Sequence, residues 1–258
     1  MSSIDSRAVI HPTANIADDA VIEPFAVVGA DVEIGAGTWV GPHAVIQGPC
    51  RIGRNNRIFQ FASVGEEPQD KKFQGERTWL EIGDGNTIRE FVTINRGTGD
   101  GGGVTRLGDD NWIMAYCHIA HDCLIGNRTV FANSASLAGH VLVEDDVILG
   151  GFSLVHQFCR LGRNSFLAFG AHVDRDVPPF VMAAGQRATP RGINGEGLRR
   201  HGFSAEAVRD LKRAYKAIYR SSLRLEDALE ELDRIGAESA DVRSMADFIR
   251  NSQRGIVR

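Results

Sequence analysis

The 258-residue chain has few cysteines, and their spacing excludes several classes of protein. Cys50, Cys117, Cys123 and Cys159 form no Cys-x-x-Cys pair, and the chain is long for a disulfide scaffold. We therefore predict four free, buried thiols in a reducing compartment.

The chain also lacks long hydrophobic runs and a strong charge of either sign. The N-terminal Met-Ser-Ser-Ile-Asp-Ser-Arg has no apolar signal core, and no run of about 18 apolar residues follows. A net charge of −4 gives no sign of nucleic-acid binding. With 43% hydrophobic residues and 29 glycines, the composition predicts a cytoplasmic, globular protein with many turns and no membrane span.

What the sequence does contain is a repeat of six residues. Steps of six from Ile10 meet an aliphatic side chain almost every time, and the register returns after two interruptions. The 25 positions are Ile10, Ile16, Ile22, Val28, Ile34, Val40, Ile46, Ile52, Ile58, Val64, Ile82, Ile88, Ile94, Leu107, Ile113, Ile119, Ile125, Phe131, Leu137, Val143, Leu149, Val155, Leu161, Leu167 and Val173. A period of six fits neither a helix nor a hairpin, but it is typical of a parallel β-helix with coils of 18 residues.

The repeat also predicts the organisation of the chain. We expect a β-helix over residues 1–189, with loops leaving it at 65–81 and 95–106, where inward aliphatics are missing or the phase breaks. Residues 190–258 instead show helical periodicity, with Ser204 as an N-cap, and form an α-helical C-terminal domain.

Basic residues gather in one part of this C-terminal region. Between residues 187 and 224 there are ten basic and three acidic side chains, in an otherwise acidic chain. This excess fits either a solvated helix face or a docking surface for an acidic partner or a phosphate.

Histidines gather where the coil period stacks the chain. His121, Gly139 and Gln157 are 18 residues apart, so they should form a column with about 4.8 Å between coils. His140 and His156 each lie one residue from that column, and His118 lies three before it. Four of the eight histidines therefore converge on one edge of the β-helix.

The spacing leaves three interpretations of this column open. His118 and His121 could bind zinc with ligands from a neighbouring subunit, or the histidines could be structural. A neutral histidine could also be a general base, with the Gly139 N–H stabilising an oxyanion. An Asp122–His121 pair looks weak, because neighbouring residues on an ideal strand point to opposite faces.

Several blocks of sequence carry a family resemblance over essentially the whole chain. They are Ile119-Ala120-His121-Asp122-Cys123, Leu137-Ala138-Gly139-His140, Val155-His156-Gln157-Phe158-Cys159, Asp176-Val177-Pro178-Pro179 and Gly197-Leu198-Arg199-Arg200-His201-Gly202-Phe203-Ser204. Together they resemble acyl-[acyl-carrier-protein]–UDP-N-acetylglucosamine O-acyltransferase, which begins lipid A synthesis. The resemblance implies an all-β left-handed parallel β-helix with a C-terminal α-helical domain, assembled as a homotrimer with active sites between subunits.

The resemblance also implies an activity: transfer of an (R)-3-hydroxyacyl group from acyl carrier protein to the 3-hydroxyl of UDP-N-acetylglucosamine, without a metal or cofactor. It makes His121 the general base and the Gly139 N–H the oxyanion donor. The implied substrate-binding positions are Asp70, Lys72, His118, His140, His156, Gln157, Asn194, Glu196 and Arg200. The basic region would then dock the acidic carrier protein.

Three residues depart from the family pattern. Asn95 stands where histidine is expected, and His201 stands where a second arginine is common. Phe169 lies where the family measures acyl length, so its ring predicts a shorter acyl chain than glycine would allow. An acceptor with a 3-amino group in place of the hydroxyl is an open alternative.

Other functions remain as rivals at this level. The N-acyltransferase of the same pathway normally carries a uridine-binding domain before its coils, whereas hexads here begin at Ile10. A coenzyme-A-dependent sugar acetyltransferase would lack the loop and C-terminal blocks. A β-helix scaffold without enzymatic activity would not explain the convergent histidines, and metal analysis would test the remaining alternative, a metal protein.

Overall fold

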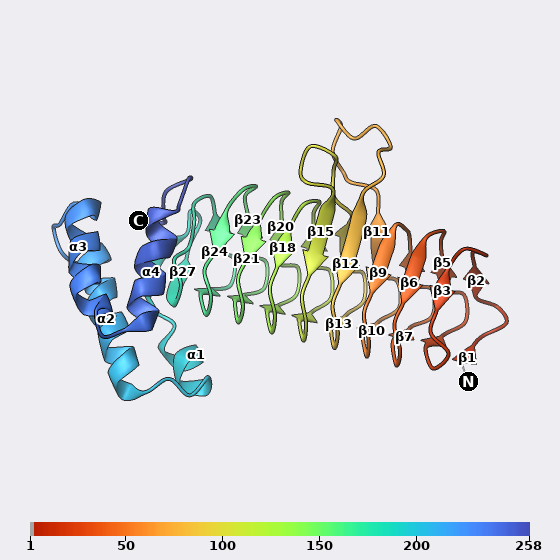
Figure 1. The fold of residues 1–258 in the computed structure, drawn as a ribbon, viewed down its shortest axis with the longest axis horizontal. Coiled ribbons are helices and arrows are strands. Elements are labelled where there is room, and N and C mark those ends of the chain that lie inside the picture. Colours follow the sequence, from red (N-terminus) through yellow and green to blue (C-terminus); the bar gives the residue numbers. More distant parts are fainter. Residues whose placement is uncertain (1–2) are drawn as a thin grey trace.

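The computed structural model describes residues 3–258 as an elongated β-helix that ends in a small helical domain (Figure 1). Short strands stack into three sheets, each forming one side of a triangular prism. In the order of hydrogen-bonded neighbours, the first sheet contains β1 (Ser3–Ile4), β4 (Val21–Ile22), β7 (Trp39–Val40), β10 (Arg57–Ile58), β13 (Thr87–Ile88), β16 (Trp112–Ile113), β19 (Val130–Phe131), β22 (Ile148–Leu149), β25 (Phe166–Leu167), β27 (Val181–Ala184) and β28 (Thr189–Ile193).

The other two sheets are parallel throughout. The second contains β2 (Val9–Ile10), β5 (Val27–Val28), β8 (Val45–Ile46), β11 (Ser63–Glu66), β14 (Thr93–Asn95), β17 (His118–Ile119), β20 (Ser136–Leu137), β23 (Leu154–Val155) and β26 (His172–Val173). The third contains β3 (Asn15–Ile16), β6 (Val32–Ile34), β9 (Cys50–Ile52), β12 (Trp79–Ile82), β15 (Val104–Leu107), β18 (Leu124–Ile125), β21 (Leu142–Val143) and β24 (Arg160–Leu161).

The six-residue repeat supplies the core of the prism, as predicted. From Ile22 onward every repeat position is buried, and partners in adjacent coils, such as Ile119 and Leu137, lie directly above one another. Ile10 and Ile16 are only half-buried, because they belong to the first coil, which is covered on one side. Burial of an Ile, Leu or Val side chain contributes about 1.5–3 kcal/mol, so this aliphatic column holds the coils together.

The two interruptions are loops that leave the prism without changing its register. Ile82 pairs with Ile52 and Leu107 pairs with Ile82, so these coils contain 12 and 7 residues beyond the usual 18. The structure confines the loops to residues 67–78 and 96–103, which are narrower limits than the predicted 65–81 and 95–106. The difference arises because β11, β12, β14 and β15 extend into the segments, and the buried Leu80 pairs with Cys50.

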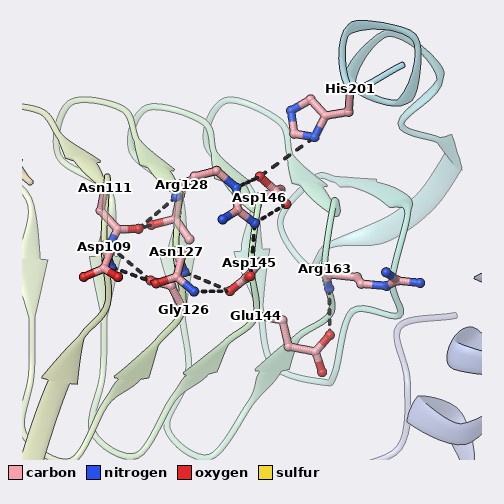
Figure 2. A network of polar contacts seen from close by, with 11 residues as sticks. Asp109, Asn111, Gly126, Asn127, Arg128, Glu144, Asp145, Asp146, Arg163 and His201 are labelled. Atoms are coloured by element: carbon pink, nitrogen blue, oxygen red, sulfur yellow. Dashed lines mark hydrogen bonds and ion pairs between the residues drawn. The ribbon is translucent and has the colours of Figure 1, made fainter. Parts of the chain in front are cut away.

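A polar ladder runs along the corner between the third and first sheets (Figure 2). Asn127 Oδ1 accepts a hydrogen bond of 2.8 Å from the N–H of Asp109, and Asp145 Oδ1 accepts one of 2.9 Å from Asn127. Glycine precedes Asp109 and Asn127 for a steric reason: a Cβ on Gly126, for example, would lie 2.4 Å from Asp145 Oδ1. Side chains thus satisfy the backbone donors that turn away from the sheets.

The C-terminal domain contains α1 (Gly195–Arg200), α2 (Ala205–Tyr219), α3 (Leu225–Gly236) and α4 (Ala240–Arg250). As predicted, Ser204 caps α2, with its side chain accepting a hydrogen bond from the N–H of Ala207. The proposed division at residue 189 falls within β28, which pairs antiparallel with β27 and closes the first sheet. The chain then returns to the prism, where Val257 donates to the carbonyl of Asp176. None of the described helices is both long and apolar enough to cross a membrane.

Candidate active site

His121 and Asp122 form a hydrogen-bonded pair at the corner after β17. His121 Nδ1 lies 2.7 Å from Asp122 Oδ2, and the Asp122 side chain is 1% exposed. The sequence-based doubt about this pair was wrong, because Asp122 has a φ of 60° and the chain turns there. The turn brings neighbouring side chains together, as an extended strand cannot. Asp122 is therefore a site residue that the sequence analysis did not select.

Asp122 is held in place by the second loop. Thr98 donates its backbone N–H to Oδ1 at 2.9 Å and its hydroxyl to Oδ2 at 2.7 Å, while the Asp122 N–H donates to Thr105 Oγ1 at 2.7 Å. These hydrogen bonds fix the orientation of the Asp122 carboxylate. It accepts the Nδ1 proton of His121, which leaves Nε2 as the basic nitrogen of the ring.

Gly139 lies directly against the His121 ring. A Cβ at this position would be 2.6 Å from His121 Cε1 and 2.8 Å from Nε2, so no side chain fits there. The predicted column is confirmed at this point, since the N–H of His140 donates to the carbonyl of His121 and that of Phe158 to the carbonyl of Gly139. The column therefore places the basic nitrogen of His121 beside the Gly139 backbone.

Two further histidines lie close to the pair. His140 packs edge-on against His121, with 5.1 Å between ring centroids, and stacks on Phe158 at 4.4 Å. His118 Nδ1 forms a hydrogen bond of 2.7 Å with Thr93 Oγ1. Burial lowers the pKa of both His118 and His140, so both rings are neutral at pH 7.

The two loops and the histidine corner enclose a pocket of about 390 Å³. The first loop supplies Asp70 and Lys72, the second supplies Thr98, and the later coils supply His140 and Phe158. The loops are tied together by a hydrogen bond of 3.0 Å from the N–H of Gly99 to the Glu76 carboxylate.

Asn95, the departure from histidine, lies at the base of the first loop. Its side-chain amide is buried in β14 and donates to the carbonyl of Glu67 at 2.8 Å. The neighbouring Arg96 forms an ion pair of 3.1 Å with the Glu67 carboxylate. Asn95 thus positions the base of the first loop.

Asn194, Glu196 and Arg200 lie in a second pocket, of about 350 Å³. Its floor is the outer face of the first sheet, including Ile148 and Phe166, so it opens on a different side of the prism from the histidine pocket. Hydrogen bonds from Arg199, and then from Arg200, lower the pKa of Glu196 to about 2.

The remaining predicted positions are spread along the later coils. Gln157 is exposed at the corner above Gly139, and His156 lies 3.5 Å from the Arg254 guanidinium. Phe169 is 75% exposed and packs edge-on against Phe152. His201 lines the second pocket, with Nδ1 3.9 Å from Asp146 at the polar corner (Figure 2). One chain therefore does not bring all the predicted residues into one cavity.

The cluster that could hold a metal fits that role poorly. Within residues 3–258, His121, Asp122 and His140 are the group whose donor atoms lie within 4.8 Å of one another. The His121–Asp122 contact of 2.7 Å is a direct hydrogen bond, shorter than two ligands at about 2.0–2.2 Å from a tetrahedral zinc would allow. Cys123 is fully buried in the core, where burial raises the pKa of its thiol to about 12. The geometry thus favours proton transfer over metal binding.

Comparison with protein-family models identifies the class of protein to which the chain belongs. Residues 31–66 and 105–139 match the bacterial transferase hexapeptide repeat. Residues 176–257 match the second domain of UDP-N-acetylglucosamine O-acyltransferase. The protein is an acyltransferase built on a left-handed parallel β-helix with a C-terminal helical domain, as the resemblance implied.

Full-length relatives then define the family. The chain is 62% identical over 258 residues to an acyl-[acyl-carrier-protein]–UDP-N-acetylglucosamine O-acyltransferase of Halorhodospira halophila, covering 100% of both chains. Solved UDP-N-acetylglucosamine acyltransferases are similar as well: that of Francisella novicida (TM-score 0.97, 44% identity, 99% and 94% coverage) and LpxA of Acinetobacter baumannii (TM-score 0.96, 45% identity, 99% coverage of each). The chain belongs to the acyl-[acyl-carrier-protein]–UDP-N-acetylglucosamine O-acyltransferase family.

Proposed function

We propose that the protein transfers an (R)-3-hydroxyacyl group from acyl carrier protein to the 3-hydroxyl of UDP-N-acetylglucosamine, the first step of lipid A synthesis. The observation that carries this proposal is the His121–Asp122 pair, whose basic nitrogen lies against Gly139. Relatives that are identical at more than half of the positions bear the name of this reaction.

In this proposal His121 Nε2 is the general base. It removes the proton from the sugar 3-hydroxyl as the oxygen attacks the thioester carbonyl carbon. The tetrahedral intermediate then collapses, the carbon–sulfur bond breaks, and the imidazolium returns the proton to the departing thiolate. Asp122 acts as a positioning residue, because it holds the ring orientation and stabilises the imidazolium while it carries the proton.

The Gly139 N–H is the proposed donor to the developing oxyanion. Gly139 allows the reacting carbonyl to approach the backbone closely, since no Cβ stands in the way. Asp70, Lys72 and His140 line the pocket, and with the nearby His118 they would surround the acceptor sugar. Their donors and acceptors suit its hydroxyl groups.

The separation of the two pockets supports a homotrimer. Asn194, Glu196 and Arg200 face a different side of the prism from His121, so one chain does not enclose the whole substrate. A neighbouring subunit related by threefold symmetry can place its second pocket opposite the first. In such a cleft Arg200 would contact a phosphate, His156 and Gln157 would contact the substrate, and Phe169 would limit the acyl tunnel.

The basic region supplies a docking surface for the acidic carrier protein. Among the residues described, Lys212 and Lys216 on α2 are exposed and form no ion pair with a carboxylate, whereas Arg209 and Arg213 each contact an acid three residues earlier. Unpaired surface cations speed association with an acidic partner. Activated carrier protein and nucleotide sugars are cytoplasmic reactants, so we place the enzyme in the cytoplasm.

An acyl-transfer assay tests the proposal. The protein is mixed with UDP-N-acetylglucosamine and a series of 3-hydroxyacyl carrier proteins, beside His121→Ala. We expect product with the wild type and a near-total loss in the variant. Product only with a 3-amino acceptor would change the assigned substrate, and activity that survives in His121→Ala would contradict the base assignment.

A further inference from the structure

A third cavity lies at the end of the molecule farthest from the first coils, between β28, the end of α2 and the last residue. It has a volume of about 480 Å³ and no acidic side chain in its lining. Three guanidinium groups line it, those of Arg191, Arg220 and Arg258. Within the described part of the chain, none of the three forms an ion pair with a carboxylate. Their positive charges are therefore not neutralised by an acidic neighbour, unlike those of Arg199, Arg209 and Arg213.

Two tyrosines complete the cavity wall. Burial raises the pKa of Tyr215, while Arg220 and Arg191 lie near enough to oppose this effect. The Tyr219 hydroxyl is buried and lacks a hydrogen-bond partner among the described residues. Buried hydroxyls are normally paired, so this unpaired group is an exception in the residue that lines the cavity.

The end of α2 does not oppose an anion here. A helix C-terminus carries about half a negative charge on its free carbonyl groups. In this chain the N–H groups of Arg220 and Ser221 donate to the Lys216 carbonyl, and Arg258 donates to the Ile218 carbonyl at 3.4 Å. With these carbonyl groups paired, three full positive charges dominate the cavity.

We propose that this cavity binds a small phosphorylated molecule, at a site separate from the acyl-transfer cleft. Guanidinium groups bind phosphate oxygens through paired, charge-assisted hydrogen bonds, and no carboxylate of the described chain competes for the three arginines here. The cavity volume is in the range of small-molecule sites, so it has room for more than the phosphate itself.

The test is calorimetric titration of the full-length protein with inorganic pyrophosphate at constant ionic strength. Two variants separate this site from the transfer cleft: Arg191→Gln/Arg220→Gln removes charge from the cavity, and Arg200→Gln removes it from the second pocket. We expect saturable binding that weakens tenfold or more in the double variant and persists in Arg200→Gln. Loss in Arg200→Gln with retention in the double variant would overturn the proposal.

Two further variants separate the effect of overall charge from the effect of the cavity wall. Arg54→Gln/Arg234→Gln removes the same charge from exposed positions outside the cavity, and Tyr215→Phe removes one hydroxyl without changing charge. We expect the affinity for pyrophosphate to be unchanged in Arg54→Gln/Arg234→Gln and to fall at least threefold in Tyr215→Phe. Equal weakening in Arg54→Gln/Arg234→Gln, or no saturable binding by the wild type, would contradict it. Melting temperatures without pyrophosphate verify that each variant is folded.

Discussion

At the scale of single residues, the His121–Asp122 pair depends on one backbone angle. Asp122 adopts a φ of 60°, a region that Asp and Asn enter more easily than most residues. Because of this turn, its carboxylate reaches the ring of the preceding His121 and the hydroxyl of Thr98 together.

Replacing this carboxylate should reduce turnover more than substrate binding. In Asp122→Asn the side-chain amide donates to Nδ1, which moves the ring proton to Nε2 and removes the base. We expect kcat to fall by about 10²–10⁴-fold, with KM nearly unchanged. Steady-state kinetics measure both. Asp109→Asn, in which Oδ1 still accepts from Asp84, is the control and should retain activity within about twofold.

The half-buried His118 should make stability depend on pH. Burial lowers its pKa in the folded state, so below about pH 6.5 the unfolded chain binds more protons than the folded one. The free energy of unfolding should therefore decrease as pH falls from 7 to 5. Urea unfolding of the wild type and His118→Gln at several pH values measures this, and the variant should show a shallower decrease. Parallel curves would contradict the assignment.

Phe169 is predicted to set the acyl length. Its exposed ring projects from the late coils, so Phe169→Gly should open space and shift the preferred donor to a longer acyl chain. Competition among carrier proteins with acyl chains of graded length gives the preference. Phe25→Gly removes an exposed ring from the first coils and should leave the preference unchanged. An unaltered preference in Phe169→Gly would refute the prediction.

At the scale of elements, the repeat made the coils predictable and the corners difficult to predict. Positions such as Ile119 and Leu137 recur every 18 residues, so their burial and the stacking of His121 on Gly139 follow from counting. The Asp122 turn, in contrast, depends on φ, which no hydrophobic pattern encodes. A signal was present in the sequence, because Asp110, Asp122 and Asp146 each stand three residues after a repeat position. All three adopt a positive φ in the structure.

The contacts made by the loops and the helical domain could not be predicted from the sequence for another reason. Thr98 meets Asp122, and Asn95 meets Glu67, through contacts between segments whose paths are set by packing. Likewise, Arg200 lies away from His121 because β28 and α1 follow a different side of the prism. A linear list of site residues contains no information about which side each one faces.

A ladder of buried asparagines stabilises the coils between these corners. Asn86 Oδ1 accepts hydrogen bonds of 2.9 Å from both the backbone and the side chain of Asn111, and Asn86 itself donates to Asn56. Asn86→Ala leaves these buried donors unpaired, so we expect about 1–3 kcal/mol of destabilisation. Thermal or urea unfolding measures it. The exposed Asn133→Ala should change stability by less than about 0.5 kcal/mol.

At the scale of the whole molecule, the two pockets open on different sides of the prism. The histidine pocket lies between the loops, and the second pocket, with Asn194, Glu196 and Arg200, lies under α1 on the first sheet. If each active site combines one pocket from each of two subunits, two variants that are inactive for different reasons should form some active sites when they assemble together.

Subunit mixing tests this arrangement. His121→Ala and Arg200→Ala, each nearly inactive alone, are unfolded, combined in equal amounts and refolded together. Random assembly should give about a quarter of the wild-type activity, in particles of about three times the 28.1 kDa chain mass. Mixing His121→Ala with Asp122→Ala, which damage the same pocket, should restore nothing. No recovery in the first mixture would place both pockets in a site within one chain.

The loops that leave the prism at its corners also bear on how such a chain can vary over generations. Ile82 stacks on Ile52, and Leu107 stacks on Ile82, as if nothing had been inserted between them. Doubling the length of a flexible loop costs only about 0.6 kcal/mol, whereas one residue added inside a strand would turn every later side chain to the wrong face. Inherited insertions and deletions can therefore reshape the loops that line the histidine pocket, while the later coils keep His140 and Gln157 where they are.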